Sequence, residues 1–513
     1  MLREAGKPRL NAASGGPGRG RRAALVVATL AVVLGGAGCE VGPQYKGPPA
    51  QPLARLHNAA AVESRPAATP APQIETWWTG FDDPELTSLV DRALAQNLDI
   101  AAAMARVEQA RAAAREAGAQ LLPALDASGS ATPLQQSLNS PIGAIARHLP
   151  GYERKQTLYD ADVGAQWEID LSGGLRRAAE AARDEEQAAE AQQLGTRVSV
   201  VAEAADAYFQ VRGDQARLAL ADSQVQTDTR LLELIRLRLS RGAAAEKEVA
   251  QAEALLAQAR ATLPPLRTDL EGQLNRLDVL MGAQPGTYAA ELSTPGAIPN
   301  APAIPPGQSA ATLLRRRPDV IAAERRLAAS SARIGVAVSE YYPKVSLAAL
   351  LGFESLSGAR LLSAESFQPQ ATAGLRWRLF DFGRIDSEVA QADSVHAQAL
   401  LAYRQTVLRA TEDVENAFMA LAQLELQTRE LVNEVDALTR ARDASQESYL
   451  GGASSLTDVL DAERQSLIAQ DELARTRADT DRAAVMSFRA LGGGWAEAPG
   501  LHAQPCSTVA ARC

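Results

Sequence analysis

The chain repeats itself, and this repeat constrains its fold more than any other feature. The segment "LDIAAAMARVEQARAAAREAGAQLLP" begins at Leu98, and "PDVIAAERRLAASSARIGVAVSEYYP" begins at Pro318. Further matches follow in the same order: Trp167 and Trp377, Gly173 and Gly383, Tyr208 and Phe418, Val249 and Val459, Glu253 and Glu463, and Gly282 and Gly492. A register kept over this length predicts two copies of one structural unit.

The duplication sets the expected organisation of the chain. We expect a signal peptide in residues 1–38, an extended segment in 39–80, the first copy in 81–282, a Pro- and Gly-rich linker in 283–312, the second copy in 313–492, and a flexible tail in 493–513. The first copy carries ten extra residues between Pro123 and Trp167. The alanine-rich composition favours long helices, so we expect a mainly α-helical chain with a small β part.

Each copy has the same internal plan. A helix of about 22 residues ends at a proline, two strands follow, and a glycine then permits a long helix to begin. The strand–helix junctions are Pro123, Gly173, Pro343 and Gly383. A helix from 175 to 241 would rise roughly 100 Å. In the second copy an apolar residue recurs every three or four positions, as in a coiled coil, from Ala410 to Leu438.

Two turns reverse the long helices. They are expected at Arg241-Gly242 and Gly451-Gly452, because glycine adopts the left-handed conformation that ends a helix. Each copy thereby predicts a long helical hairpin that returns to Gly282 or Gly492.

The strand "DADVGAQWEIDL" (160–171) alternates without a miss between apolar and polar residues. A half-buried antiparallel sheet would explain this pattern, and so would a transmembrane barrel with lipid outside and water inside. Ala161 to Leu171 is long enough to cross a bilayer at a slant, and Trp167 and Trp377 fall near the helix ends of their strands. Four strands cannot close a barrel, so the membrane interpretation requires several chains.

The N-terminus favours the membrane interpretation. Basic residues precede a short apolar run, Ala23 to Gly38, which is typical of a signal peptide. Small residues directly before Cys39 resemble a bacterial lipoprotein signal that would acylate this cysteine, while ordinary cleavage nearby is the alternative. Cys506 and Cys513 lie in the tail, where they could pair or have no structural role.

Other classes of function have little support in the sequence. The formal net charge is −9 and there is no basic patch, so we expect no nucleic-acid partner. The four histidines are scattered without metal-ligand spacing, and neither a phosphate loop nor a catalytic triad is present, so we expect no enzyme, metal or cofactor. Arg315, Arg316 and Arg317 could bind phosphate, but a solvated helix start or salt bridges between protomers fit better.

Three motifs carry a family resemblance: "GCEVGPQYKGPP" from Gly38, "LLRRRPDVIAAERRLAASSARIGVAVSEYYPKVSL" from Leu313, and "YLGGASSLTDVLDAERQSL" from Tyr449. They resemble the TolC-like outer membrane factors, in particular the NodT-type outer membrane lipoproteins. The resemblance implies a homotrimer in which a twelve-stranded transmembrane β-barrel, four strands per protomer, continues into a periplasmic α-helical barrel. It also implies the exit duct of a tripartite efflux pump, with a periplasmic adaptor and an inner-membrane pump of the resistance-nodulation-division class.

The resemblance assigns roles to particular residues. Cys39 would be the lipid anchor in the outer membrane, and the turns at Arg241, Gly242, Gly451 and Gly452 would contact the adaptor. Asp461 falls where the family has an acidic ring that narrows the closed duct, with Thr457 and Asp458 beside it. Such a ring could bind cations or pair with Arg238, Arg241 or Arg464. Alternatively, Asp458 and Asp461 merely favour the N-terminus of their helix.

Two alternatives to drug efflux remain at this point. The duct could serve type I protein secretion, or the chain could be a periplasmic coiled-coil adaptor that forms no channel. An adaptor would show one hairpin and lipoyl-like β domains, whereas this sequence predicts two hairpins and four amphipathic strands. No motif in the sequence identifies the transported substrate.

Overall fold

The computed structural model describes residues 40–48, 56–58, 60, 65, 70–305 and 315–496. The chain forms two compact units. Of the described residues, the first unit contains 40–43, Gly118–Ala178 and Ile334–Val389, and the second contains those within 44–117, 179–333 and 390–496. Each unit therefore takes corresponding segments from both copies of the repeat.

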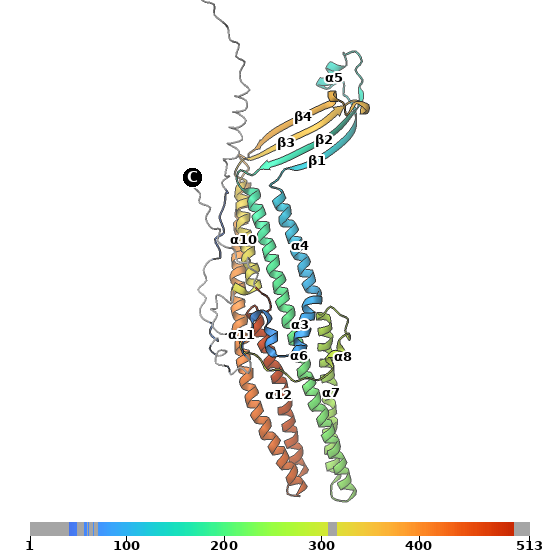
Figure 1. Cartoon of the computed structure of the whole chain (residues 1–513), viewed down its shortest axis with the longest axis vertical. Helices are drawn as coiled ribbons and strands as arrows, with labels where there is room; N and C mark the ends of the chain where they lie inside the picture. Colours follow the sequence, from blue (N-terminus) through green and yellow to red (C-terminus); the bar gives the residue numbers. More distant parts are fainter. Residues whose placement is uncertain are drawn as a thin grey trace, which may run out of the picture. The chain divides into compact units, whose positions relative to one another are not determined.

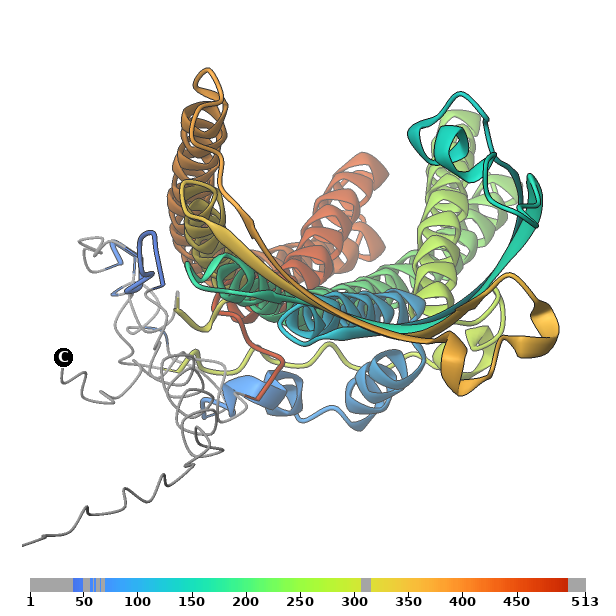
Figure 2. The ribbon, with the colours of Figure 1, turned by 90° about the horizontal axis from the view of Figure 1, so that it is seen from above.

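The first unit is built around a four-stranded antiparallel sheet in the order β1-β2-β3-β4. The strands are β1 (Ala124–Gln135), β2 (Lys155–Ile169), β3 (Lys344–Ser355) and β4 (Phe367–Arg376), and the sheet is curved (Figures 1 and 2). Helix α5 (Pro141–Ala146) lies in the β1–β2 connection. The short turns η2 (Gly358–Arg360) and η3 (Ala364–Ser366) lie between β3 and β4.

Two strand ends differ from the prediction. Strand β2 ends at Ile169 rather than Leu171, because the carboxylate of Asp170 accepts hydrogen bonds from the backbone N–H (2.9 Å) and Nε (3.3 Å) of Arg176. Strand β4 ends at Arg376, opposite Lys344, so Trp377, which was expected within the end of this strand, lies directly after it. The residue before Lys344 is a proline and has no N–H to continue the ladder.

The second unit is helical. It contains η1 (Ile74–Phe81), α3 (Pro84–Gln96), α7 (Glu246–Leu280), α8 (Ala289–Leu292), α12 (Leu456–Ala490) and most of α4 (Leu98–Ala119), α6 (Gly174–Ser240), α10 (Pro318–Ser339) and α11 (Arg384–Leu450). Equivalent elements match in length: α4 and α10 have 22 residues each, α6 and α11 have 67, and α7 and α12 have 35. The predicted tandem repeat is confirmed.

The predicted coiled-coil stripe on α11 faces its neighbours. Ala410, Val414 and Leu421 are fully buried, and Leu431 is nearly so. Val435 and Leu438, the last two positions of the stripe, are only half-buried. The stripe is therefore confirmed, and its packing is looser at its C-terminal end.

One large apolar cluster joins the two copies in the helical unit. The ring of Trp77 in η1 stacks on Phe488 in α12 with centroids 5.3 Å apart, and Phe81 packs on Phe209 of α6. Asp83 caps α3 and also accepts a 2.6 Å hydrogen bond from the hydroxyl of Tyr208. The segment that precedes the first copy is thus part of the core.

Four helix ends have the same left-handed glycine turn: Gly242, Gly282, Gly452 and Gly492, with φ between +69° and +77°. A Cβ on Gly282 would lie 2.5 Å from the carbonyl oxygen of Gln96, whereas one on Gly242 would meet nothing within 4 Å. An alanine at position 242 would therefore test the backbone strain alone, whereas one at position 282 would add a steric clash.

We expect Gly242→Ala to lower the free energy of unfolding by about 1–2 kcal/mol, the cost of the left-handed backbone alone. Gly282→Ala should lower it by about 1–3 kcal/mol more, because overpacking adds to the strain. Urea unfolding of the purified protein in detergent, followed by circular dichroism, measures both. Equal losses in the two variants would contradict the steric argument.

Candidate functional site

The strand–helix junctions are built alike in both copies. Pro123 and Pro343 stand directly before β1 and β3, and Gly173 and Gly383 adopt φ of +82° and +81° before the long helices. The indole N–H of Trp167 donates to the carbonyl of Leu121 (3.0 Å), and that of Trp377 donates to the carbonyl of Tyr341 (2.9 Å). Trp167 therefore links the end of β2 to the residues just before β1, and Trp377 links the end of β4 to the residues just before β3.

The sheet has one apolar and one mostly polar face. The strand register places Val163 opposite both Ala127 and Leu351, and Leu347 opposite both Trp167 and Ala373. On the other face the hydroxyls of Ser128 and Ser130 donate to the carboxylates of Asp162 and Asp160. The alternation predicted for one strand therefore extends across all four.

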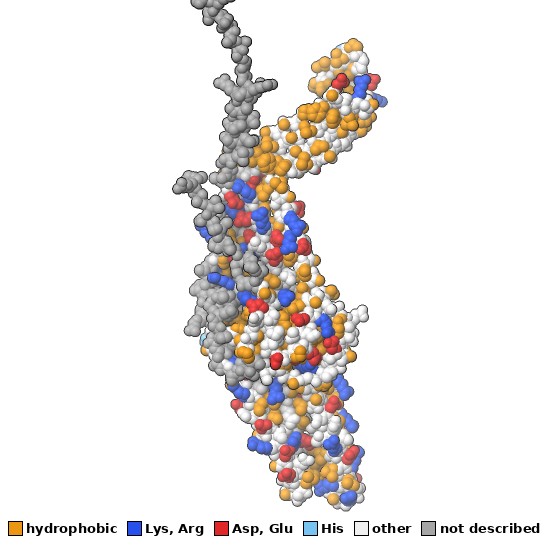
Figure 3. All heavy atoms as spheres, in the orientation of Figure 1, with side chains coloured by type: hydrophobic (Ala, Val, Ile, Leu, Met, Phe, Trp, Pro, Cys, Tyr) orange, Lys and Arg blue, Asp and Glu red, His pale blue; other side chains and the backbone are white. Residues whose placement is uncertain are grey.

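No described residue covers the apolar face of the sheet. Leu125, Leu351 and Leu375 are 61–72% exposed. Figure 3 shows the hydrophobic side chains along the sheet. A contiguous apolar surface of this kind marks contact with lipid or with another protein. Both edges are also open, since within the described chain β1 pairs only with β2, and β4 only with β3.

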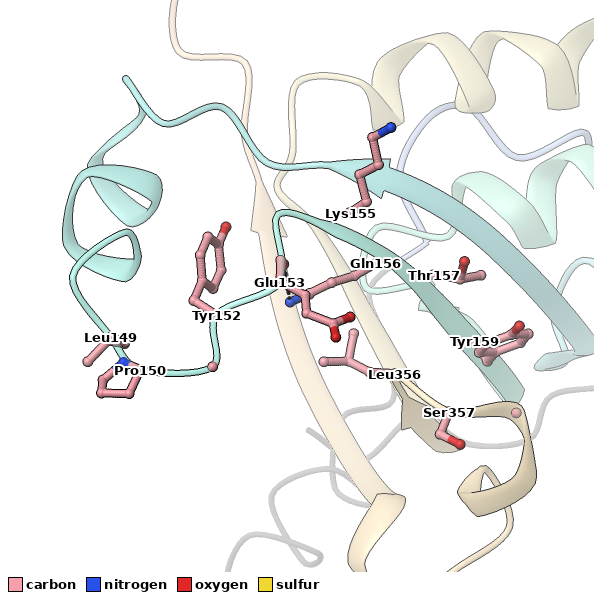
Figure 4. A pocket seen from close by; sticks show the side chains of 12 residues that line it. Leu149, Pro150, Tyr152, Glu153, Lys155, Gln156, Thr157, Tyr159, Leu356 and Ser357 are labelled. Carbon is pink, nitrogen blue, oxygen red and sulfur yellow. Dashed lines mark hydrogen bonds between the residues drawn. The ribbon is translucent and has the colours of Figure 1, made fainter.

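A cavity of about 700 Å³ lies among the loops that connect the strands (Figure 4). The β1–β2 connection lines it with Leu149 and Tyr152, and the β3–β4 connection lines it with Leu356 and Ser357. The β1–β2 connection (136–154) has 19 residues and the β3–β4 connection (356–366) has 11, so eight of the ten extra residues of the first copy lie in the β1–β2 connection. The two copies therefore diverge at these loops.

The predicted turns lie at the ends of the hairpins. The N–H of Gly242 bonds to Leu239 O and that of Ala243 to Arg238 O, and Gly452 and Ala453 repeat this pattern. Arg241, Gly242, Gly451 and Gly452 are all exposed. The four residues expected to contact an adaptor are therefore accessible in the single chain.

The three predicted gate residues lie in the first turns of α12, and all are exposed. The carboxylate of Asp458 accepts from the N–H of Ser455 (3.0 Å), and Ser455 caps Asp458 in return. Asp458 thus completes a capping box, as the helix-terminus alternative requires. Asp461 instead approaches Arg464 at 3.6 Å, with 61% of its side chain exposed.

The arginines considered as partners of Asp461 have different surroundings. Arg464 is the one that pairs with Asp461 within the described chain. Arg238 stacks over the ring of Tyr449 at 4.8 Å, and burial raises the pKa of this tyrosine. Arg241 is exposed at the turn. A link from Arg238 or Arg241 to Asp461 would therefore have to come from another chain or another conformation.

The sequence suggested a solvated helix start at Arg315, Arg316 and Arg317, but only Arg315 is exposed. Arg317 is 9% exposed and binds Asp319 (2.8 Å), Asp413 (2.9 Å) and two backbone carbonyls. Arg316 binds Glu75 (2.8 Å) and stacks over Trp495. Both side chains therefore have structural partners within the chain, while Arg315 is exposed.

Sequence reasoning missed a pair of buried carboxyl groups between the two hairpins. Asp228 on α6 is 1% exposed and Glu463 on α12 is 8% exposed. Burial and the charge of Glu463 raise the pKa of Asp228 to about 7, and burial raises the pKa of Glu463. A signal was present, because Asp228 shares the apolar spacing of Leu232 and Ile235 and so occupies a core position.

The residues after Cys39 contact the strand–helix junction. The N–H of Val41 donates to Ser172 O (3.1 Å), and Glu40 pairs with Arg177 at 3.4 Å. Gly42 lies against Gly335 so closely that a Cβ would be 2.5 Å from its Cα. Cys39, Cys506 and Cys513 themselves lie outside the described residues.

The described residues contain neither a membrane-spanning helix nor a cluster of metal ligands. No helix among them combines the length and the apolar character needed to cross a membrane. No group of three or more His, Cys, Asp or Glu side chains there is arranged to hold a metal ion.

Known proteins resemble this chain over most of its length. A sequence profile described as outer membrane efflux protein matches residues 89–283 and 310–493. The pyoverdine export outer membrane protein OpmQ of Pseudomonas putida is 32% identical over 82% of this chain and 88% of its own, and nodulation protein T of Rhizobium leguminosarum bv. trifolii is 31% identical over 89% and 95%. The solved outer-membrane channel OprN superimposes with a TM-score of 0.81 at 33% identity, covering 89% of this chain and 100% of that one.

Proposed function

This chain belongs to the outer membrane efflux protein family, and from that premise we propose that it passes small molecules outward as a trimeric duct gated near Asp461. Its place is the outer membrane, and its family is one of channel proteins. The observation that carries the proposal is the four-stranded sheet with one exposed apolar face and two open edges. Three such sheets joined edge to edge give twelve strands with lipid outside and water inside.

Small molecules are the proposed cargo. The relatives include a toluene efflux pump outer membrane protein and an antibiotic efflux pump outer membrane protein, both from Pseudomonas putida, besides the pyoverdine exporter. These names concern small compounds rather than secreted proteins, so they favour efflux over type I secretion.

The partners follow from the same reasoning. A periplasmic adaptor would engage the exposed turns at Arg241-Gly242 and Gly451-Gly452, and an inner-membrane pump of the resistance-nodulation-division class would supply the energy. Exposed glycine turns leave backbone and small side chains accessible, which allows another helical hairpin to approach closely.

The lipid anchor is proposed at Cys39. The contacts of Glu40, Val41 and Gly42 hold the following residues against Ser172, Arg177 and Gly335. Acylation would tether the chain to the membrane independently of the barrel. Mass spectrometry of the mature N-terminal peptide, with Cys39→Ser as control, checks this assignment.

The gate is assigned to Asp461 rather than Asp458. Asp458 already serves the capping box of α12, whereas Asp461 and the exposed Thr457 are free of helix-end contacts in the described chain. Three Asp461 carboxylates brought together on a threefold axis would repel one another and attract cations. Arg464 would moderate this repulsion.

We expect Asp461→Ala to change the closed duct measurably. The variant should lose cation selectivity, alter single-channel conductance in planar bilayers and increase the passive entry of large antibiotics into cells. Asp436→Ala, at an exposed position of α11, is the matched control and should leave all three unchanged. Unchanged conductance and selectivity in Asp461→Ala would remove this residue from the gate, and a wild-type protein without channels would refute the duct.

A further inference from the structure

A groove of about 540 Å³ lies in the helical unit, between the two hairpins. It is lined by α6, α7 and α12, and α7 carries the helix-interior pair Pro264-Pro265 at this level. Its apolar lining includes Leu220, Leu255, Leu266, Leu467 and Ile468. Such a surface suits an organic molecule better than a hydrated ion.

The charged residues of this groove leave it net negative. Asp228, Asp269, Asp471 and Glu472 line it, against Arg217 and Arg464. Arg217 is already engaged, because its guanidinium binds Asp471 at 2.7 and 3.1 Å and lies 3.8 Å from Asp214. Arg464 lies beside Asp461. A cationic ligand would therefore meet uncompensated negative charge.

Asp228 is one of the residues that line the groove, and it is 1% exposed. Its Oδ1 accepts a 2.7 Å hydrogen bond from the side chain of Gln224, while its buried Oδ2 has no hydrogen-bond partner. A buried carboxylate oxygen without a donor is unfavourable, so a ligand that supplies positive charge there would relieve this penalty.

We propose that this groove binds a lipophilic organic cation, with Asp228 as its counter-ion and the leucine-rich walls around its apolar body. The site would occur once in each chain. The equivalent positions of the second hairpin hold Leu438 in place of Asp228, and Ala474 and Arg475 in place of the two prolines. The inference goes beyond the duct itself, because binding does not require transport.

The charged surroundings of Asp228 make binding depend on pH. Burial and then Glu463 raise the pKa of Asp228, and the Gln224 hydrogen bond lowers it, leaving it at about 7. Glu463 in turn is buried and faces Arg442 of α11. A cation favours the ionised carboxylate, so affinity should be nearly full at pH 8 and should fall as the pH drops through 7.

The test uses the complete mature trimer in detergent and the fluorescent cation ethidium. At pH 8 we expect saturable binding, and at pH 6 affinity about five- to tenfold weaker, because most Asp228 carboxyls are then protonated. Asp228→Asn should weaken binding at pH 8 by about tenfold or more and should remove the pH dependence. Asp436→Asn, which is exposed on α11, is the matched control.

Two further measurements keep the test decisive. Ile468, a groove residue that is 63% exposed, can be replaced by lysine, whose ammonium would compete with ethidium for Asp228. Ile468→Lys should therefore weaken ethidium binding several-fold. The second measurement uses the uncharged dye Nile red, whose binding should be the same in Asp228→Asn as in the wild type.

Equal ethidium affinity in the wild type and Asp228→Asn, or no saturable binding at pH 8, would overturn the proposal. If Asp228→Asn does not form trimers, the pH series and Ile468→Lys decide instead. Single-channel recordings on the same wild-type preparation show separately whether the duct conducts, so failure of this site and failure of the proposed function are distinguishable.

Discussion

Leu351→Arg is expected to abolish stable insertion of the protein into the outer membrane. Leu351 lies within β3 on the apolar face, opposite Val163, and its side chain is 61% exposed. Arginine at mid-membrane on the lipid face of a barrel is unfavourable by about 2–4 kcal/mol, and a trimer would carry three. The measurement is the amount of heat-modifiable trimer in isolated outer membranes.

The neighbouring residue supplies the control. Leu350 has the opposite parity and lies between Gly164 and Gln370, on the face assigned to the water-filled interior. Leu350→Arg should therefore assemble at near wild-type amounts. If both variants insert equally well, the apolar face does not meet lipid, and the barrel must be rejected.

The second large effect is expected in the helical unit. Arg317→Met removes a guanidinium that donates hydrogen bonds to two buried carbonyl oxygens, those of Ala410 (3.3 Å) and Ala490 (3.1 Å). The carbonyl of Ala410 lies inside α11 and keeps its helical partner, whereas that of Ala490 is the last of α12 and would lose its donor. One buried unsatisfied carbonyl is unfavourable by about 1–3 kcal/mol, so the free energy of unfolding should fall by about that amount. The half-exposed acidic partners, Asp319 and Asp413, should contribute less because water can replace the guanidinium.

Arg315→Met is the matched control, since Arg315 is exposed two residues earlier. Thermal unfolding of both variants, followed by helical circular dichroism, compares them directly. A loss of the same size in Arg315→Met would mean that the buried hydrogen bonds of Arg317 are not the cause.

The sequence alone was sufficient where a pattern is local. The alternation in residues 160–171 predicted a two-faced strand, and the matched glycines and prolines predicted the junctions and turns. The repeat predicted equal helix lengths, because both copies must build the same hairpin. These features depend on residues close together along the chain.

The rest depends on distant partners. The role of Arg317 could not be predicted, because its acceptors at Ala410 and Ala490 lie far along the chain and carry no side-chain signal. The pKa of Asp228 is raised by burial and by the charge of Glu463, which α12 places near it, and neither can be read from the neighbouring sequence. The observed end of β2 differs from the predicted one because the contact of Asp170 with Arg176 replaces strand pairing there.

The open edges of the sheet have a genetic consequence. Since β1 and β4 find partners only in sister chains, every barrel is a joint product of three polypeptides. In a cell that makes equal amounts of intact and Leu351→Arg chains, random association leaves roughly one trimer in eight free of the altered chain. Such an allele would behave as dominant, and doubling the dose of the intact gene would restore only part of the lost ducts.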